Sequence, residues 1–528
     1  MSHENESILV GKWEVIKPQF KHLPIHLALL HTGEILGFGG SANEKEMEGK
    51  WYLPEIFSPN YSDHNNGTVR EISDAGIEGD LFCVGHAYLP DGRLFIAGGT
   101  HKYDGFFSLE FAFPPFSGLE QSYIFDPVDY SWTRLQNMRH GRWYPTCIML
   151  EDGSIATFAG LTKWPPWVIL NYHEICTKIE NKYVWKHLEG ANKFLPLYPR
   201  IHLMPNGELF YSGSYNTHMT FPFTLFGFNI GTFKPGQKGW KKIPNPENMH
   251  RQEGSSVLLP LNPPYDKWKI MLMGGGDTVG NHITKKTEII RFDSKSEETP
   301  RYEEYKNMIY NRYYVYAVIL PDQNILVVGG KDGHMGHHHG NEGCIDESTG
   351  NPRHTEDAVM DAEMFITKEE RWTKVATMSV DRLYHSNAIL LPDGSVMTAG
   401  SVMTAGSNPS RKCFEKRIEI YKPPYFFKGE RPKILKHPTL IKYDEKFDIE
   451  TLDVNNIESI AIIRPSNTTH CLNPEQRYVG LKFEKKKNDN ILSIQVPGNK
   501  NLAPPGYYML FILNSKKIPS IASFVLLS

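Results

Sequence analysis

Apolar residues in this chain fall into short runs that come in pairs. In each pair, an apolar run is followed by a tight turn of the Asp-Gly or Asn-Gly kind or a variant of it, a second apolar run, and one or more glycines. The pattern recurs at residues 26–40, 85–99, 147–160, 201–213, 255–276, 316–330 and 386–400. Because a tight turn between two apolar runs is a strong local signal for a β-hairpin, we predict seven hairpins.

The spacing of the hairpins predicts how they assemble. The copies lie roughly 55–70 residues apart, close to the period of about 50 residues of kelch repeats. Segments between them, such as those around Trp132 and Trp372, supply outer strands and a tryptophan to pack between neighbours. No helical pattern separates the strands, as a barrel of alternating strands and helices would require. We therefore predict an all-β fold, a seven-bladed kelch-like β-propeller.

The repeat stops near residue 415, and a different pattern follows. Residues 432–528 contain short alternating strands such as FDIETL, ILSIQVP and YYMLFILN. Their size and turn spacing are typical of an immunoglobulin-like β-sandwich. We assign residues 1–431 to the propeller and residues 432–528 to the sandwich.

Composition excludes several classes of function. The 57 basic and 60 acidic residues give a formal net charge of −3 with no sustained basic face, which argues against nucleic acid as a partner. No apolar run approaches the roughly 18 residues of a membrane-spanning helix. The first residues show no basic segment followed by an apolar one, so the sequence alone indicates a cytoplasmic protein, which we expect to be a monomer. Six cysteines in 528 residues do not make a disulfide framework.

Chemically reactive residues share one register in the repeat. The position eight residues before the turn Asp or Asn holds Cys83, Tyr144, Tyr198, Tyr314 and His385 in different hairpins. Equivalent positions of different blades face the same end of a propeller axis, so these side chains should gather at one concave mouth. Each residue taken alone is more often a packing residue than a ligand, and aromatic residues also recur in kelch blades for packing.

Four segments resemble the copper-site segments of galactose oxidase and glyoxal oxidase. They are GDLFCVGHAYLPDGRLFIAGG, GRWYPTCIMLEDGSIATFAG, DRLYHSNAILLPDGSVMTAG and, in the sandwich, IIRPSNTTHCLNPEQRYVGL. The tail LAPPGYYMLFILNSKKIPSIAS is similar to the closing strands of the same family. The likeness runs in order from about residue 26 to the C-terminus, across both domains.

The resemblance implies a catalytic centre. Cys83 would be joined to Tyr144 by a thioether, and copper would be held by Tyr144, Tyr384, His385 and His470. It implies a copper ion with a protein-derived Cys-Tyr radical as cofactors, and oxidation of a primary alcohol or aldehyde by O2 to give hydrogen peroxide. Tyr384 would accept the substrate proton as general base. Family members generally act outside the cytoplasm, so the resemblance favours a secreted protein.

The chemistry of these residue types agrees with the implied metal. Imidazoles and phenolates suit tetragonal copper(II), whereas zinc sites more often combine Cys and His at short spacings. Side chains of consecutive strand residues face opposite ways, so Tyr384 and His385 cannot both bind one ion from a regular strand. We therefore predict an irregular backbone at that point.

Further residues are expected around the mouth. By the resemblance, an indole from residues 161–167 would stack on the thioether. Strict register places Thr162 at the position of that indole. We therefore assign the indole to Trp164, two residues further on, with Trp167 as the alternative. Tyr314 and Arg251 resemble substrate-pocket residues. Lys331 and Asp332 follow the sixth hairpin and should border the same pocket.

Two local features lie outside the pattern. His334, His337, His338 and His339 form a tract that is either a polar loop or a weak metal-binding segment. SVMTAG occurs twice in succession, at residues 395–406, which must lengthen a strand or a loop. A non-catalytic kelch propeller that binds a protein or glycan is the alternative to an oxidase.

Overall fold

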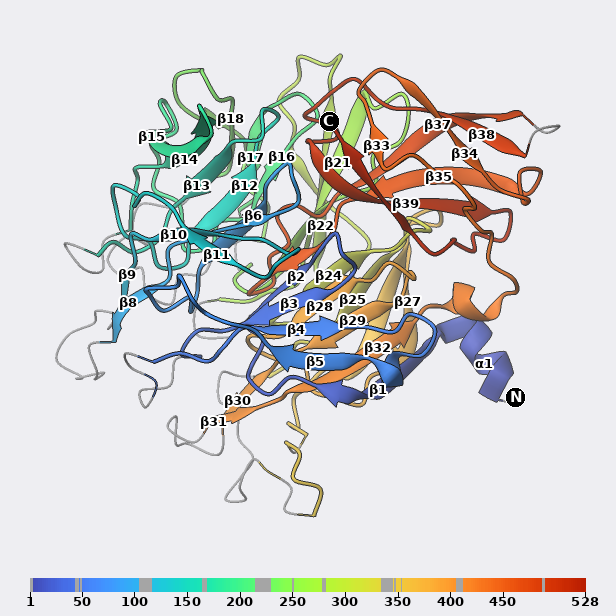
Figure 1. The fold of residues 1–528 in the computed structure, drawn as a ribbon, viewed down its shortest axis with the longest axis horizontal. Coiled ribbons are helices and arrows are strands. Elements are labelled where there is room, and N and C mark those ends of the chain that lie inside the picture. The colour runs from blue at the N-terminus through green and yellow to red at the C-terminus, as the bar shows by residue number, and fades with distance from the viewer. Residues whose placement is uncertain are drawn as a thin grey trace.

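Seven antiparallel sheets, each built on one predicted hairpin, form the blades of a propeller (Figure 1). The computed structural model describes residues 3–42, 47, 50–103, 116–163, 169–213, 229–248, 251–277, 282–333, 345, 348–352, 354–404, 412–486 and 490–528. Each hairpin supplies the two inner strands of its blade, and the predicted seven-bladed, all-β fold is confirmed.

The first four blades follow the chain in order. Blade 1 contains β2 (His26–Leu29), β3 (Ile35–Phe38), β4 (Glu55–Ser58) and β5 (Thr68–Glu71). Blade 2 contains β6 (Gly85–Tyr88), β7 (Leu94–Ala97), β10 (Ser122–Phe125) and β11 (Trp132–Arg134). Blade 3 contains β12 (Thr146–Met149), β13 (Ile155–Phe158), β14 (Glu174–Ile179) and β15 (Lys182–His187). Blade 4 contains β16 (Ile201–Leu203), β17 (Leu209–Tyr211), β18 (Gly231–Phe233) and β19 (Lys241–Lys242).

The last three blades include one strand from the other end of the chain. Blade 5 contains β20 (Ser255–Leu258), β21 (Lys267–Met273), β22 (Thr287–Asp293) and β23 (Tyr302–Glu304). Blade 6 contains β24 (Tyr316–Ile319), β25 (Ile325–Val328), β26 (Asp361–Ile366) and β27 (Arg371–Thr377). Blade 7 contains β28 (Asn387–Leu390), β29 (Val396–Ala399), β32 (Arg417–Lys422) and, outermost, β1 (Lys12–Gln19). The chain therefore closes the propeller by pairing its first strand with its last blade strand.

The repeated SVMTAG is accommodated without disturbing blade 7. The first copy forms β29, in the position that the equivalent strands occupy in other blades. The second copy contributes β30 (Val402–Thr404), which pairs with β31 (Lys412–Phe414) in a separate two-stranded ribbon. A similar ribbon, β8 (Thr100–Tyr103) with β9 (Phe116–Gly118), extends from blade 2.

The C-terminal strands form a nearly closed sandwich, drawn in red and orange in Figure 1. It contains β33 (Leu440–Ile441), β34 (Lys446–Glu450), β35 (Ile457–Ile463), β37 (Tyr478–Lys486), β38 (Ile491–Gln495), β39 (Gly506–Asn514) and β40 (Ser523–Leu527). The sandwich packs against the hairpin turns, where His31 stacks on Tyr507 with ring centroids 4.1 Å apart.

Helices are short in the described ranges. They are α1 (His3–Val10) and the 3-10 helices His64–Asn66 and Pro424–Phe427. None of the helices in these ranges combines the length and the apolar character needed to span a membrane.

The core lies between neighbouring blades. The indole of Trp132 contacts Phe38 of the preceding blade, and Trp372 donates a hydrogen bond to the carbonyl of Lys306, as expected for tryptophans that pack between blades. Buried arginines at the blade tops pair with glutamates of the third strands: Arg142 with Glu174, Arg251 with Glu288, and Arg312 with Glu363. These pairs fix the segments that lead into the hairpins of blades 3, 5 and 6.

Candidate functional site

The residues in the predicted register share an unusual backbone conformation. Cys83, Tyr144, Tyr198, Tyr314 and His385 all have φ between 47° and 66°. This left-handed region is uncommon for residues other than glycine. Backbone hydrogen bonds link these positions from blade to blade, since Tyr144 N donates to Cys83 O at 3.1 Å and Tyr198 N donates to Tyr144 O at 2.9 Å. The register therefore forms a ring of constrained residues around the axis.

The left-handed residue turns consecutive side chains to the same side. Tyr384 and His385 stack with ring centroids 3.8 Å apart, and the φ of His385 is 62°. Trp143 and Tyr144 stack in the same way, at 3.9 Å and 15° between planes, where the φ of Tyr144 is 62°. The predicted irregular backbone at Tyr384 and His385 is thus confirmed, and Tyr144 shares it.

A loop of the sandwich occupies the axis and delivers His470. In it, β36 (Asn467–Thr468) pairs with β2 of blade 1, and Asn467 donates to the carbonyl of His86 in blade 2. Gln476, on the returning leg, donates to the carbonyl of Ala317 in blade 6. The two halves of the loop therefore run along inner strands of the blades. His470, between them, has a φ of 47° and reaches the ring of left-handed register residues.

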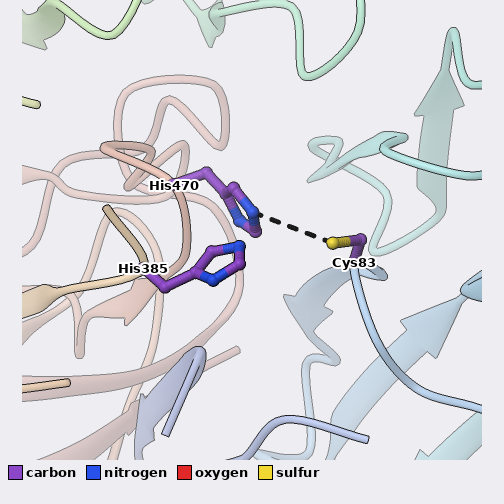
Figure 2. A group of neighbouring side chains, drawn as sticks. All are labelled: Cys83, His385 and His470. Carbon is purple, nitrogen blue, oxygen red and sulfur yellow. Dashed lines mark hydrogen bonds between the residues drawn. The ribbon is translucent and has the colours of Figure 1, made fainter. Parts of the chain in front are cut away.

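Five predicted residues converge on one point. The hydroxyl oxygens of Tyr144 and Tyr384 are 2.5 Å apart, and Tyr144 Oη lies 3.0 Å from His470 Nε2. Cys83 Sγ lies 3.8 Å from the same nitrogen. Ligand atoms of Cys83, His385 and His470 all lie within 4.8 Å of one another; Figure 2 shows both imidazoles directed toward Cys83 from the opposite side. These distances bring the two imidazoles, the two phenols and the thiol close enough together to share one metal ion.

Burial favours the neutral forms of Tyr144, Tyr384 and His470. It raises the pKa of the Tyr144 phenol well above its usual value, and nearby Cys83 and Tyr384 raise it further. Burial also raises the pKa of Tyr384 and lowers that of His470 well below the usual value for histidine. A bound divalent cation reverses this preference for the phenols, because it stabilises phenolate directly. The donor set fits copper(II), which favours imidazole nitrogen together with anionic oxygen.

An indole does stack on Tyr144, and it belongs to Trp143. The sequence assigned this role to Trp164 or Trp167, and both lie outside the described residues. Thr162, the strict-register residue, is buried. Trp143 was missed because alternation along a regular strand places the residue before Tyr144 on the other face.

The expected pocket residues differ in their surroundings. Tyr314 is buried beside Tyr384, with ring centroids 5.5 Å apart. Lys331 is fully buried and pairs with Asp357, while Asp332 is exposed. Their contact with a substrate stays a prediction.

Arg251 occupies a structural position. It is 1% exposed, pairs with Glu288 and donates to the carbonyls of Gly274 and Lys286, as the equivalent arginines of other blades do with their partners. Its role as a substrate contact stays a prediction. The histidine tract at 334–339 lies outside the described residues.

Sequence reasoning also missed the register position of blade 5. Glu253 takes the register position of blade 5 with a φ of 53°, and it accepts a long contact of 3.9 Å from the thiol of Cys471. Burial raises the pKa of the Glu253 carboxyl to about 7. Counting back from the turn failed here because the hairpin of blade 5 has a longer turn.

Comparison with known proteins agrees with this arrangement. The model of the glyoxal oxidase N-terminus matches residues 58–425, and that of the galactose oxidase-like early set domain matches residues 431–527. The aldehyde oxidase GLOX of Vitis pseudoreticulata is 27% identical over 566 residues, which cover 98% of this chain and 97% of the relative.

Two more distant proteins share the same layout. The galactose oxidase of Gibberella zeae is 23% identical over 92% of this chain, which spans 65% of that protein's length. A fungal alcohol oxidase of the AA5 family, solved in complex with copper, superposes with a TM-score of 0.77 at 20% identity, over 98% of this chain and 100% of that one. This structural likeness concerns the fold.

Proposed function

This chain belongs to the glyoxal oxidase family and is a copper oxidase, and we propose that it oxidises a primary alcohol or an aldehyde with O2 to give hydrogen peroxide. The observation that carries the proposal is the convergence of Tyr144, Tyr384, His385 and His470 on one point beside Cys83. Three different blades and the sandwich loop contribute these residues, and a scaffold protein has no structural need for such a set.

In the proposed centre, Tyr144, Tyr384, His385 and His470 hold the copper ion. Copper(II) supplies a one-electron acceptor when it is bound, whereas oxidation of an alcohol to an aldehyde removes two electrons. The second acceptor would be Tyr144 itself, modified by Cys83, because a sulfur substituent spreads unpaired spin and makes a phenol easier to oxidise. The protein thereby builds its own organic cofactor.

The environment of Cys83 supports the thioether. The thiol is fully buried, and it is hydrogen-bonded to Tyr144, an interaction that opposes the rise of its pKa caused by burial. Forming the bond joins Sγ to a ring carbon and removes one hydrogen from each. O2 accepts the two electrons and two protons and becomes hydrogen peroxide.

The residues then divide the work of turnover. Tyr384 takes the proton of the substrate hydroxyl, and its hydrogen bond of 2.5 Å to Tyr144 keeps the two phenol oxygens side by side. The oxygen of Tyr144 takes the hydrogen from the substrate carbon. Both hydrogens finally pass to O2, which balances the conversion of an alcohol and O2 to an aldehyde and hydrogen peroxide. Tyr384 is the partly exposed member of the set, consistent with contact with substrate.

The predicted partners are small molecules, and a disulfide bears on the compartment in which the protein acts. We infer that the enzyme takes a small alcohol or aldehyde and O2, and we expect it to act as a monomer. Cys413 is disulfide-bonded. Because disulfides persist in oxidising compartments, this bond supports secretion over the cytoplasmic location indicated by the first residues.

Mass spectrometry of copper-loaded, aerobically incubated full-length protein tests the proposal. The peptides that contain Cys83 and Tyr144 should be joined, with a mass lower by two hydrogens than their sum. Cys83→Ser should lose both the link and peroxide formation with a panel of alcohols and aldehydes. Cys147→Ser, which changes another buried cysteine, should keep both. Absence of the link and of bound copper in the wild-type chain would favour a non-catalytic propeller instead.

A further inference from the structure

Two buried histidines lie behind the proposed copper centre. His26 begins β2 and is 0% exposed, and His86 lies in β6 and is 4% exposed. Among the residues the structure describes, neither ring nitrogen of His86 has a partner at hydrogen-bond distance and angle, and the one hydrogen-bonding group that acts on the His26 ring is the backbone of Leu81. Leaving a buried polar group unsatisfied costs about 1–3 kcal/mol, so these rings need another explanation than packing.

Other buried histidines of the described chain do have partners. His173 accepts a hydrogen bond from Ala159 N and contacts the carbonyl of Lys193. His202, on the innermost strand of blade 4, lies 2.7 Å from the hydroxyl of Ser256. His26 and His86 therefore differ from their counterparts.

The two rings adjoin the proposed copper ligands. The centroids of His26 and His86 are 5.2 Å apart, and His26 lies 6.2 Å from His470, which is 4.5 Å from His385. The rings of His26 and His86 are nearly perpendicular, at 88°, and metal–nitrogen bonds are about 2 Å long, so centroids 5.2 Å apart lie within the reach of one ion bound to both rings. Four imidazoles thus run in a row from blade 2 to the copper centre.

The electrostatic surroundings select the charge of a bound ion. Burial lowers the pKa of His86 to about 3 and that of His26 well below its usual value, which keeps both rings neutral with a lone pair available. Apart from burial, the groups that shift the pKa of His26 are His86, His470 and the backbone of Leu81, and none of them is a carboxylate. The cost of burying an ion rises with the square of its charge, so a neutral pocket disfavours divalent ions strongly relative to monovalent ones.

We propose that His26 and His86 form a second metal site, which binds Cu(I) and passes it to the copper centre through His470. Imidazole is a suitable copper ligand, and Cu(I), unlike zinc with its four tetrahedral ligands, is stable with two. The delivery step rests on the proposed copper function, while binding at His26 and His86 does not.

Metal stoichiometry of the full chain tests the site. Apoprotein is titrated anaerobically with Cu(I), and in parallel with redox-inert Ag(I), against a chromophoric chelator. The wild-type chain should retain two equivalents and His86→Leu only one, while His202→Leu, the matched change of a partnered histidine, should retain two. His86→Cys should restore the second equivalent, because a thiolate is a good Cu(I) ligand.

Loading kinetics test the delivery step separately. Formation of the link between Cys83 and Tyr144 after addition of Cu(I) and air should slow about tenfold in His86→Leu and reach the same final extent. His385→Ala should lose the equivalent that His86→Leu keeps; if it loses none, the proposed copper centre fails while the second site stands. A wild-type chain that retains one equivalent, or equal losses in His86→Leu and His202→Leu, would overturn the second site.

Discussion

Thr469 should control the affinity of the copper centre without touching the ion. Its Oγ1 lies 2.6 Å from Nδ1 of His470, and both residues are buried. Ligation through Nε2, the nitrogen that faces Tyr144, requires the proton on Nδ1, and Thr469 accepts that proton's hydrogen bond. Thr469→Val keeps the shape of the side chain and removes the acceptor.

The expected size of the effect follows from two independent magnitudes. Leaving the buried Nδ1–H of His470 unpaired costs about 1–3 kcal/mol. Loss of a partner that orients a metal-bound histidine typically weakens metal affinity by about 10–100-fold, which corresponds to about 1.4–2.8 kcal/mol. We therefore expect the dissociation constant for copper(II) to rise by at least about tenfold.

The assay is a competition titration of apoprotein with copper(II) and a chelator of known affinity. The neighbouring Thr468 provides a matched control: it is also buried, and among the described residues its hydroxyl has no hydrogen-bond partner. Thr468→Val should bind copper as the wild type does. If Thr469→Val binds copper within about twofold of Thr468→Val, the orientation of His470 does not depend on Thr469 and the reasoning is refuted.

Three further predictions concern the frame of the site. Glu363→Gln removes the charge that pairs with fully buried Arg312 and should lower the free energy of unfolding by about 3–5 kcal/mol, whereas Glu369→Gln, in an exposed pair, should cost less than about 1 kcal/mol in chemical denaturation. Burial holds the pKa of Glu253 at about 7, against 4.5 for the unfolded chain, so stability should fall by about 3 kcal/mol as pH rises through this window. The melting temperature measured against pH should show this fall in the wild type and not in Glu253→Gln. Trp143→Leu should retain copper but destabilise the oxidised centre by about 1 kcal/mol in a redox titration, since it removes the indole stack.

The sequence predicted the blades because their signals are local. Apolar runs and turn residues within about 15 positions predict each hairpin. The regular spacing of the hairpins then limits the folds that the chain can adopt. Closure of blade 7 by β1 could not be predicted in this way, since the partners Trp13 and Tyr421 are far apart in sequence. The sequence also could not predict which SVMTAG copy forms the blade strand, because both copies have the same residues.

The residues of the proposed copper centre were found by register and resemblance, and their neighbours were not. Strand alternation predicts opposite orientations for Trp143 and Tyr144, and only the left-handed φ of Tyr144 brings the two rings together. His86 had no distinguishing signal, because its importance comes from the absence of a partner in the described structure, which no local pattern encodes. Glu253 escaped the count because the turn of its hairpin is longer.

The backbone of the ring constrains three residues of the proposed copper centre. A left-handed conformation in a residue other than glycine costs on the order of 1–3 kcal/mol, and Cys83, Tyr144 and His385 each adopt one. Hydrogen bonds between blades hold these residues, as from Tyr144 N to Cys83 O, and they join backbone atoms rather than the side chains that would bind the ion. Folding of the propeller therefore offsets this cost and orders these residues, so copper binding does not have to order them. By contrast, His470 arrives on a loop of another domain, so docking of the sandwich completes the site, and copper should stabilise that docking in return.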